Sequence, residues 1–420
     1  MPVTLGAAGC TSLLNGDASE SSTRASRATV TPTTTLSPTE GSPTTSTRTS
    51  EPPKTVQTDA ESRTPKASPT PTISERVGTP ALSTGPTSGV FEFGHAVGLS
   101  EGIAIVVAEE DGAHVFAEDD GWSGTAVLKP AERDDFGGYN VSAALVGEAA
   151  VVGGPGAGTD DDTGAVYMFE RSDGEWNQRH RFTTDDEESV DFGKSVDFDG
   201  ERVVVGDAND PETMVTWVGS AYVFEGGGSN WTRVASLETG DQDLFGAAVG
   251  VDGETVLVGA PYASLGDVQM GAVYVYERVN GTWQRRAVLA PPAADGERQF
   301  GQSVAIDGDT AVVGAPVSYG EGSSAYVYER SESLWYQRAR LTDPEAGTHP
   351  GFGEAVSIDD GLVVVSRPGG AGTGRVYVFS AADDWSDPLR LMGADPDEEA
   401  DFGVAVDVAG STALVGAPAY

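Results

Sequence analysis

Hydrophobic and polar residues alternate along much of this chain in short segments that are separated by turn sequences. The segment after residue 300 is typical: Val304 and Ile306 alternate with polar neighbours, as in a half-buried β-strand, and Asp307-Gly308 then favours a tight hairpin turn. Further strands are predicted over residues 310–313, 325–328 and 335–341. This segment therefore predicts one four-stranded sheet.

The same order of strands and turns recurs along the chain, and each copy opens with a Phe-Gly pair. Successive pairs are 43 to 56 residues apart. The pairs are Phe93-Gly94, Phe136-Gly137, Phe192-Gly193, Phe245-Gly246, Phe300-Gly301, Phe352-Gly353 and Phe402-Gly403. A period near 50 residues in strand-like sequence indicates a radial repeat, so seven copies predict an all-β, seven-bladed β-propeller over residues 89–420.

Two further features share this period. Gly-Ala-Pro ends the second strand at residues 259–261, 314–316 and 416–418, because proline cannot continue a ladder of backbone hydrogen bonds, and Ser366-Arg367-Pro368 is an eroded copy. A tryptophan precedes the fourth strand in six copies: Trp122, Trp176, Trp231, Trp283, Trp335 and Trp385. Their identical placement predicts packing between blades, since a four-stranded sheet of this length cannot bury both faces alone.

These residues resemble the FG-GAP repeat family, which includes the propeller of integrin α subunits, over about residues 90 to 420. Kelch repeats have a similar period, but the Phe-Gly and Gly-Ala-Pro sequences favour the FG-GAP interpretation. The resemblance implies that the first strand of each blade lines a central channel. It also implies that the 4–1 and 2–3 loops form a ligand-binding upper face, and that the 1–2 turns often carry a calcium motif of the D-x-D-x-D-G type.

The seventh copy ends at Tyr420, just after its second strand, so its third and fourth strands are missing. An open propeller would leave two blade edges unpaired, which promotes aggregation. We interpret the ending as a truncated reading frame or a fragment. Closure by a short N-terminal strand, for which Val90–Phe93 offers a sequence, is the alternative.

The composition narrows the classes of function. The net charge is −40, from 65 acidic and 25 basic residues, which excludes a nucleic-acid binder because phosphate contacts need lysine and arginine. The acidic excess fits either solvation in high salt, where screening removes self-repulsion, or cation binding. Because the charge is spread over every blade and arginine replaces lysine almost throughout, we favour a halophilic protein of archaeal origin.

The N-terminal residues predict an anchor and a stalk. Residues 11–88 are dominated by Thr, Ser and Pro, which predicts a disordered, O-glycosylated stalk. Cys10 is the only cysteine, and the sequence that it ends, residues 5–10, resembles a lipoprotein box; a cysteine placed there by chance is the alternative. No basic region and too short an apolar stretch precede it, which a start codon assigned too late would explain. We expect residues 1–10 to be a signal remnant and the protein to be lipid-anchored on the outer face of the membrane.

Asn230 and Asn280 head glycosylation sequons at equivalent 3–4 turns of successive blades, and we expect both to be acceptors.

Calcium is the one cofactor that the sequence suggests. Asp197 with Asp199, and Asp307 with Asp309, come nearest to the family motif in the 1–2 turns, and Asp160, Asp161 and Asp162 form the densest carboxylate group, in a 2–3 loop. Calcium needs six to eight oxygen ligands, and these turns offer one or two carboxylates each. Hairpin turns and solvated surface therefore remain the alternative interpretations.

A partner-binding surface is predicted in the 2–3 loops of the upper face. Trp217 lies in the longest of them, residues 207–219, beside Asn209 and Asp210. Tyr262 and Tyr319 occupy the equivalent loops. Exposed aromatic residues dominate interface hot spots, so these five residues outline the predicted contact surface.

The function predicted from the sequence is a non-catalytic one. We expect a cell-surface adhesion or binding module that recognises an extracellular protein or glycan through the upper-face loops. A hydrolase or lyase that acts on extracellular polymers in the central channel is one alternative, and a structural spacer is another. An enzyme should direct polar groups into the channel from several first strands, whereas these strands present mainly Ala, Val, Ser and Gly, which favours tight packing.

Overall fold

The computed structural model describes residues 93–418 with short gaps, together with the backbone of two short N-terminal strands. The gaps are residues 109–110, 119–120, 133–135, 138–140, 157–163, 186–188, 190, 209–217, 240–242, 293–298, 318–321, 346–349, 370–373 and 393–400. No helix in the described part of the chain is long and apolar enough to cross a membrane.

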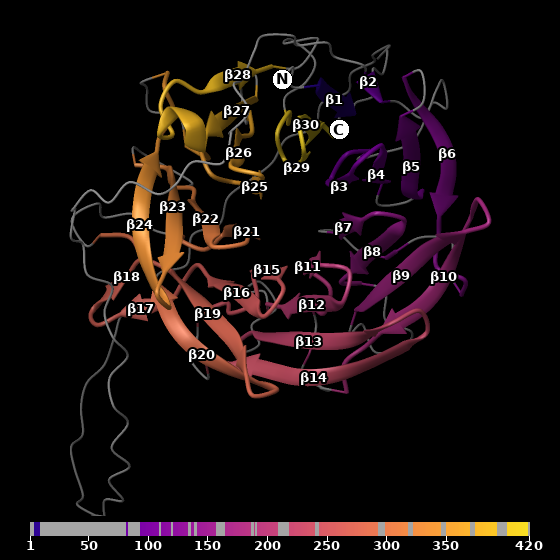
Figure 1. Ribbon diagram of the computed structural model, residues 1–420, viewed down its shortest axis with the longest axis horizontal. Helices are drawn as coiled ribbons and strands as arrows, with labels where there is room; N and C mark the ends of the chain where they lie inside the picture. The colour runs from indigo at the N-terminus through magenta and orange to yellow at the C-terminus, as the bar shows by residue number, and fades with distance from the viewer. Residues whose placement is uncertain are drawn as a thin grey trace, which may run out of the picture.

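Four-stranded sheets are arranged around a central axis, which confirms the all-β propeller (Figure 1). Six of them are complete antiparallel blades whose four strands are consecutive in the sequence. The first three blades comprise β3 (Ala96–Ser100), β4 (Ile103–Ala108), β5 (Gly112–Glu118) and β6 (Trp122–Leu128); β7 (Ser142–Val146), β8 (Ala149–Gly154), β9 (Ala165–Ser172) and β10 (Glu175–Phe182); and β11 (Ser195–Phe198), β12 (Arg202–Asp207), β13 (Ser220–Gly227) and β14 (Asn230–Glu238).

The next three blades follow the same order. They comprise β15 (Ala248–Asp252), β16 (Thr255–Ala260), β19 (Ala272–Val279) and β20 (Thr282–Leu289); β21 (Ser303–Asp307), β22 (Thr310–Ala315), β23 (Ser324–Ser331) and β24 (Leu334–Leu341); and β25 (Val356–Asp359), β26 (Leu362–Arg367), β27 (Arg375–Ser380) and β28 (Leu389–Leu391). Two short elements supplement them: the hairpin β17 (Ser264–Leu265) and β18 (Val268–Gln269), and the 3-10 helix η2 (Ala381–Asp383).

The seventh position holds a hairpin instead of a complete antiparallel blade. It consists of β29 (Val406–Ala409) and β30 (Thr412–Gly416). Strand β1 (Thr4–Ala8) pairs with β30 in parallel, and β2 (Ala81–Leu82) pairs with β1 in parallel. The strands beside β30 are therefore not the Val90–Phe93 segment that the sequence suggested for closure; residues 90–92 lie outside the described residues.

The first strands form a closed ring. Each contacts the first strand of the next blade, in the order β3, β7, β11, β15, β21, β25, β29 and back to β3. The 1–2 turns all lie on one side of this ring, which we call the turn face. The 2–3 and 4–1 connections lie on the opposite side, which we call the loop face, because successive antiparallel strands reverse direction.

The Phe-Gly pairs hold each blade together and join it to its neighbour. All seven phenylalanines are at most 1% exposed. In the fifth blade, Phe300 packs edge-on against Tyr328 of the third strand, with ring centroids 6.1 Å apart. Aromatic residues occupy equivalent positions in the other complete blades, which explains why the pair recurs with the blade period.

The glycine of the Gly-Ala-Pro sequence allows two blades to approach closely. A Cβ atom on Gly259 would lie 2.0 Å from the carbonyl oxygen of Gly301 in the next blade. The same contact joins the seventh position to the first blade, where a Cβ atom on Gly416 would lie 2.0 Å from the carbonyl oxygen of Gly94. The ring therefore closes with the contact that the complete blades use.

The repeated tryptophans pack as predicted in the later blades. Trp231, Trp283, Trp335 and Trp385 are buried, and Trp122 and Trp176 are half-buried. Their shared role is structural.

Candidate functional site

Side chains at the 1–2 turns hydrogen bond to the next blade along the ring. Each accepts a backbone N–H from the neighbouring turn, and we call these contacts turn clasps. They join Ser100 Oγ to Gly147 N (2.9 Å), Asp252 Oδ2 to Gly308 N (2.6 Å), Asp307 Oδ2 to Asp360 N (2.9 Å) and Asp359 Oδ2 to Gly410 N (2.5 Å). Asp307, one of the predicted calcium ligands, therefore binds backbone in this structure.

Asp309 and Asp199, two further predicted calcium ligands, also bond to the protein. Asp309 forms an ion pair with Arg330, at 2.7 Å between Oδ1 and Nε. Asp199 Oδ1 accepts the backbone N–H of Glu201 (2.8 Å) and of Arg202 (2.7 Å), which closes its own hairpin turn.

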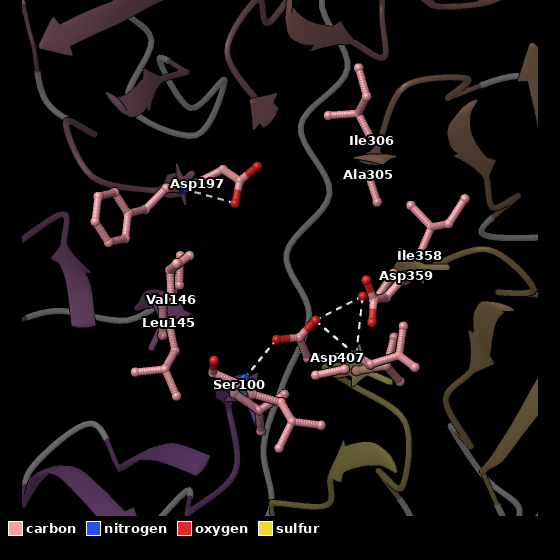
Figure 2. A pocket seen from close by; sticks show the side chains of 18 of the residues that line it. Ser100, Leu145, Val146, Asp197, Ala305, Ile306, Ile358, Asp359 and Asp407 are labelled. Atoms are coloured by element: carbon pink, nitrogen blue, oxygen red, sulfur yellow. Dashed lines mark hydrogen bonds between the residues drawn. The ribbon is translucent and has the colours of Figure 1, made fainter. Parts of the chain in front are cut away.

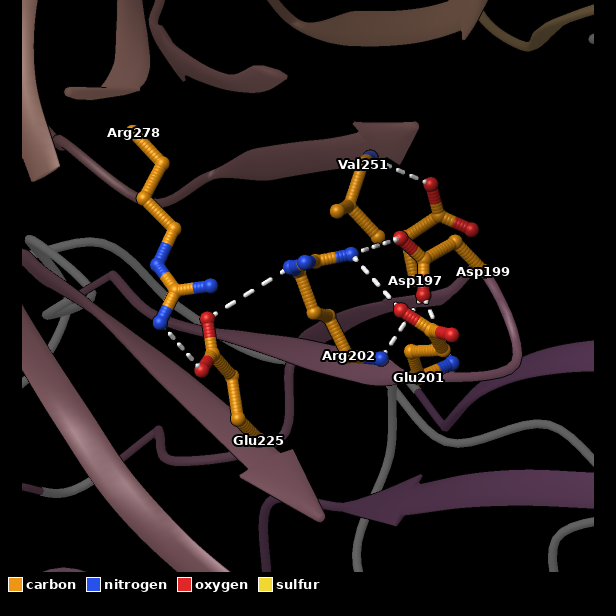
Figure 3. A network of polar contacts seen from close by, with 7 residues as sticks. All are labelled: Asp197, Asp199, Glu201, Arg202, Glu225, Val251 and Arg278. Carbon is orange, nitrogen blue, oxygen red and sulfur yellow. Dashed lines mark hydrogen bonds and ion pairs between the residues drawn. The ribbon is translucent and has the colours of Figure 1, made fainter. Parts of the chain in front are cut away.

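Asp199 also belongs to an ion-pair network that links two blades (Figure 3). Its Oδ2 lies 3.3 Å from Nη1 of the buried Arg202. Arg202 also contacts Glu225 at 3.5 Å, and Glu225 contacts Arg278 of the next blade at 2.9 Å. Among the described residues, no group of three or more His, Cys, Asp or Glu side chains is arranged to hold a metal ion.

A cavity of about 630 Å³ occupies the central channel, and all seven first strands contribute to it (Figure 2). It extends to the turn face, because turn residues such as Glu101 and Gly410 line it. Most of the residues that line it are aliphatic, including Val97, Leu99, Leu145, Val249, Ile306 and Ile358, but polar atoms make up the larger part of the surface that faces the cavity. The small residues of the first strands therefore leave a cavity, where the sequence had favoured tight packing.

Two aspartates face this cavity from opposite sides of the ring. Asp197 lies in β11 of the third blade and Asp407 in β29 at the seventh position (Figure 2). Both occupy the fifth position after the phenylalanine of the Phe-Gly pair, where other blades carry a small residue such as Gly250 or Ala305. The sequence showed this difference, but the register that directs both carboxylates to one cavity required the structure.

Backbone donors position both carboxylates. Asp197 Oδ2 accepts the N–H of Val251 in the next blade at 2.7 Å, and its Oδ1 accepts that of Phe198 at 2.9 Å. Asp407 Oδ2 accepts the N–H of Leu99 in the first blade at 2.7 Å. Its Oδ1 accepts the hydroxyl of Ser357 at 2.8 Å and its own neighbouring N–H. Asp407 therefore connects the seventh position to both of its neighbours.

Burial makes both groups weaker acids than usual. Loss of hydration inside the channel raises the pKa of Asp197 to about 7, and the charges of Asp407 and Asp199 add to this. Burial likewise raises the pKa of Asp407 to about 6, against three hydrogen bonds that lower it. No positively charged group is among the causes of either shift.

The loop face carries the predicted partner-binding residues, of which the structure describes Tyr262. This half-buried residue opens the 2–3 loop of the fourth blade, in which β17 and β18 form a projecting hairpin. Gln269 Nε2 donates to the Tyr262 carbonyl at 3.0 Å, and Val268 is 53% exposed at the tip. The loop is therefore braced internally and presents an apolar residue to solvent.

Several predicted residues lie outside the described part of the chain. They are Trp217, Asn209, Asp210 and Tyr319 of the contact surface, Asp160, Asp161 and Asp162 of the carboxylate group, and Cys10. Asn230 and Asn280 are described and exposed, and Asn280 adopts a positive φ of 52° in its turn. Their glycosylation stays a prediction.

One charged cluster on the loop face was not predicted. Arg367 is 6% exposed, and its Nε lies 3.2 Å from Asp343 Oδ2. Tyr377 donates to Asp343 Oδ1 at 2.7 Å, while Arg375 pairs with Glu345 at 2.7 Å. The eroded Ser366-Arg367-Pro368 sequence was the available signal, because an arginine replaces the alanine of Gly-Ala-Pro there.

A comparison with models of protein families agrees with this architecture. The FG-GAP repeat model matches residues 176–224, 231–276, 283–328 and 335–379. Each match runs from the fourth strand of one blade to the third strand of the next, so the sequence repeat and the structural blade are offset by one strand. No curated protein matches the sequence. The crystal structure of the computationally designed Ika8 protein is similar at 13% identity and a TM-score of 0.46, over 79% of this chain and 95% of that one.

Proposed function

Because this chain is an FG-GAP repeat β-propeller, a fold typical of binding modules, we propose that it is a non-catalytic recognition module that contacts its partner through the loop face. The observation that carries the proposal is the hairpin β17–β18, which presents Val268 at 53% exposure and is braced by the bond from Gln269 to the Tyr262 carbonyl. A loop that is already ordered loses little conformational entropy on binding.

The contrast between the two faces supports this assignment. The 1–2 turns are short, and turn clasps engage the polar side chains of four of them. The loop face instead carries connections that differ in length from blade to blade, including residues 207–219 with Trp217. Variable loops on a rigid scaffold are where recognition residues concentrate.

The polar groups of the channel favour binding over catalysis. Asp197 and Asp407 both accept backbone N–H groups of a neighbouring blade, so both contribute to ring closure. The described lining residues include no histidine, cysteine, lysine or arginine that could act beside them as a base or nucleophile. The polar groups of the channel therefore fit a role in ring closure better than one in catalysis.

We further propose that the propeller is displayed outside the cell. Cys10 in its lipoprotein-like sequence would carry the anchor, and the Thr/Ser/Pro-rich residues 11–88 would form the stalk. The net charge of −40 supports an extracellular protein of a haloarchaeon, which would bind an extracellular protein or glycan in high salt.

The direct experiment measures binding of the fluorescently labelled full-length chain to intact cells of the organism that encodes it, in multimolar salt. We expect saturable binding that Trp217→Ala and Tyr262→Ala weaken at least about tenfold, since truncation of an aromatic anchor costs about 1.4 kcal/mol or more. Tyr336→Ala is the matched control, because Tyr336 is a 38% exposed tyrosine on the outer strand β24. Absence of saturable binding, or equal loss in all three variants, would overturn the proposal.

A further inference from the structure

The seventh position extends its sheet with a strand from near the N-terminus. In each complete blade, the second strand pairs with the antiparallel third strand that follows it in the sequence. At the seventh position β30 instead pairs in parallel with β1, from Thr4 with Thr412 to Ala8 with Gly416 (Figure 1). A strand that is distant in the sequence therefore occupies the edge that a third strand occupies in the other blades.

Strand β1 lacks the features that fix a third strand in its blade. Parallel pairing is slightly less stable per residue than antiparallel pairing. Aromatic residues of the third strands pack against the phenylalanine of the Phe-Gly pair in the complete blades. The sequence of β1 contains no aromatic residue, and no aromatic ring of the described residues packs against Phe402. Residues 9–80 separate β1 from β2, and closing so long a loop costs conformational entropy.

The residues of β1 also have a second predicted use. Residues 5–10 resemble a lipoprotein box, and processing before Cys10 would cut the chain just after β1. One molecule cannot both keep β1 on β30 and carry a lipid on Cys10, because cleavage separates β1 from the rest of the chain. This step rests on the proposed lipid anchor.

We propose that β1 is a removable strand: it covers the edge of β30 until processing before Cys10 cuts it from the propeller, and the anchored protein then carries that edge open. An open edge presents a row of unpaired backbone N–H and C=O groups, to which another extended segment can add. The ring itself stays closed, because Gly416 still lies against Gly94 and Asp407 still accepts the N–H of Leu99.

The test is hydrogen exchange of the full-length chain and of the processed form in multimolar salt. The processed form begins at residue 10 and carries Cys10→Ser, so that no thiol reacts. We expect the backbone amides of β30 to exchange at least about tenfold faster in the processed form. The amides of β22, the second strand of a complete blade, should exchange equally in both forms. An excess of a synthetic peptide of residues 1–9 should restore slow exchange, and the same residues in scrambled order should not.

Two changes in the full-length chain separate the loss of β1 from the loss of chain length. Gly6→Pro keeps every residue but removes a backbone N–H from the middle of β1, and should speed the exchange of β30 as processing does. Deletion of residues 11–19 removes the same number of residues from the predicted stalk and keeps β1, so exchange should match that of the parent protein.

Equal exchange of β30 in the full-length and processed forms would overturn the proposal, because β1 would then not cover that edge. Faster exchange in every blade would also overturn it, because the ring would then need β1. Retention of residues 1–9 on the protein isolated from its own cells would remove both this inference and the proposed anchor. None of these outcomes bears on recognition by the loop face, which the titration with Trp217→Ala and Tyr262→Ala tests separately.

Discussion

The turn face and the loop face of the propeller are built from the same repeat, but the turns vary little from blade to blade whereas the loops differ. On the turn face, short hairpins repeat with little variation, and their carboxylates bind the next blade at 2.5 to 2.9 Å. On the loop face, the fourth blade carries the hairpin β17–β18, which no other blade repeats among the described residues, and the sixth carries the buried Arg367 paired with Asp343. The features that recur from blade to blade are therefore the ones that close the ring. The features found in a single blade are the candidate recognition sites.

The largest loss of stability should come from a change at the close contact between neighbouring blades, on which both faces depend. Gly259→Ala would place a Cβ atom 2.0 Å from the Gly301 carbonyl oxygen, and backbone in two blades would have to move. We expect a loss of about 3 kcal/mol in the free energy of unfolding, measured by denaturant titration. Gly227→Ala has no atom within 4 Å of the new Cβ and should change stability by about 0.5 kcal/mol or less. Similar losses in both variants would contradict the close-contact explanation.

The channel carboxylates should give the next largest effect, visible as a dependence on pH. Asp197 has a pKa of about 7 in the folded protein and an ordinary value of 3.8, so between these values the folded state holds a proton that the unfolded state releases. The free energy of unfolding should therefore fall as the pH rises from about 4 to about 7.

Asp197→Asn removes this contribution, and should reduce the slope by about 1 kcal/mol per pH unit in that window. Thermal unfolding from pH 5 to pH 8 measures it, and Asp252→Asn controls for the loss of one negative charge. If stability depends on pH in the same way in the parent protein and in Asp197→Asn, then Asp197 ionises as it does in the unfolded chain, which would contradict the prediction.

A smaller effect is expected for a single turn clasp. Asp307→Ala removes the bond to the Asp360 N–H, which lies at an exposed turn, and should destabilise the protein by about 1 kcal/mol. Because the clasp needs no metal, 5 mM calcium should leave the melting temperature of the parent protein and the variant equally unchanged. A calcium-induced rise that is lost in Asp307→Ala would instead establish Asp307 as a metal ligand.

The parts of the molecule that repeat could be predicted from the sequence. The strands, their order and the buried Phe-Gly and tryptophan positions follow from the alternation of hydrophobic and polar residues and from a period near 50 residues. Seven copies of the same pattern allow the strands to be assigned even where one copy is ambiguous. The seventh position was the exception. Its two own strands were predicted, but the parallel pairing of β1 with β30 has no counterpart in the other blades and therefore no repeat signal.

The candidate sites were less predictable because their residues meet only in three dimensions. Asp197 and Asp407 are 210 residues apart in the sequence, and the ring brings them to one cavity. The turn aspartates looked like a degenerate metal motif, since sequence spacing alone does not show that the next blade offers an N–H to Asp197 and to Asp307. Arg367 was visible as an eroded Gly-Ala-Pro, but its partners Asp343 and Glu345 come from the preceding connection.

The contrast between the faces is tested most directly by placing one charge on each and measuring partner binding. Val268→Glu alters the loop-face hairpin, where Val268 is 53% exposed, and Val146→Glu alters the turn face, where Val146 is 38% exposed. In the cell-binding titration in multimolar salt, we predict that Val268→Glu weakens saturable binding at least about tenfold while Val146→Glu binds like the parent protein. Weakening by Val146→Glu with no change in Val268→Glu would contradict the assignment and place recognition on the turn face.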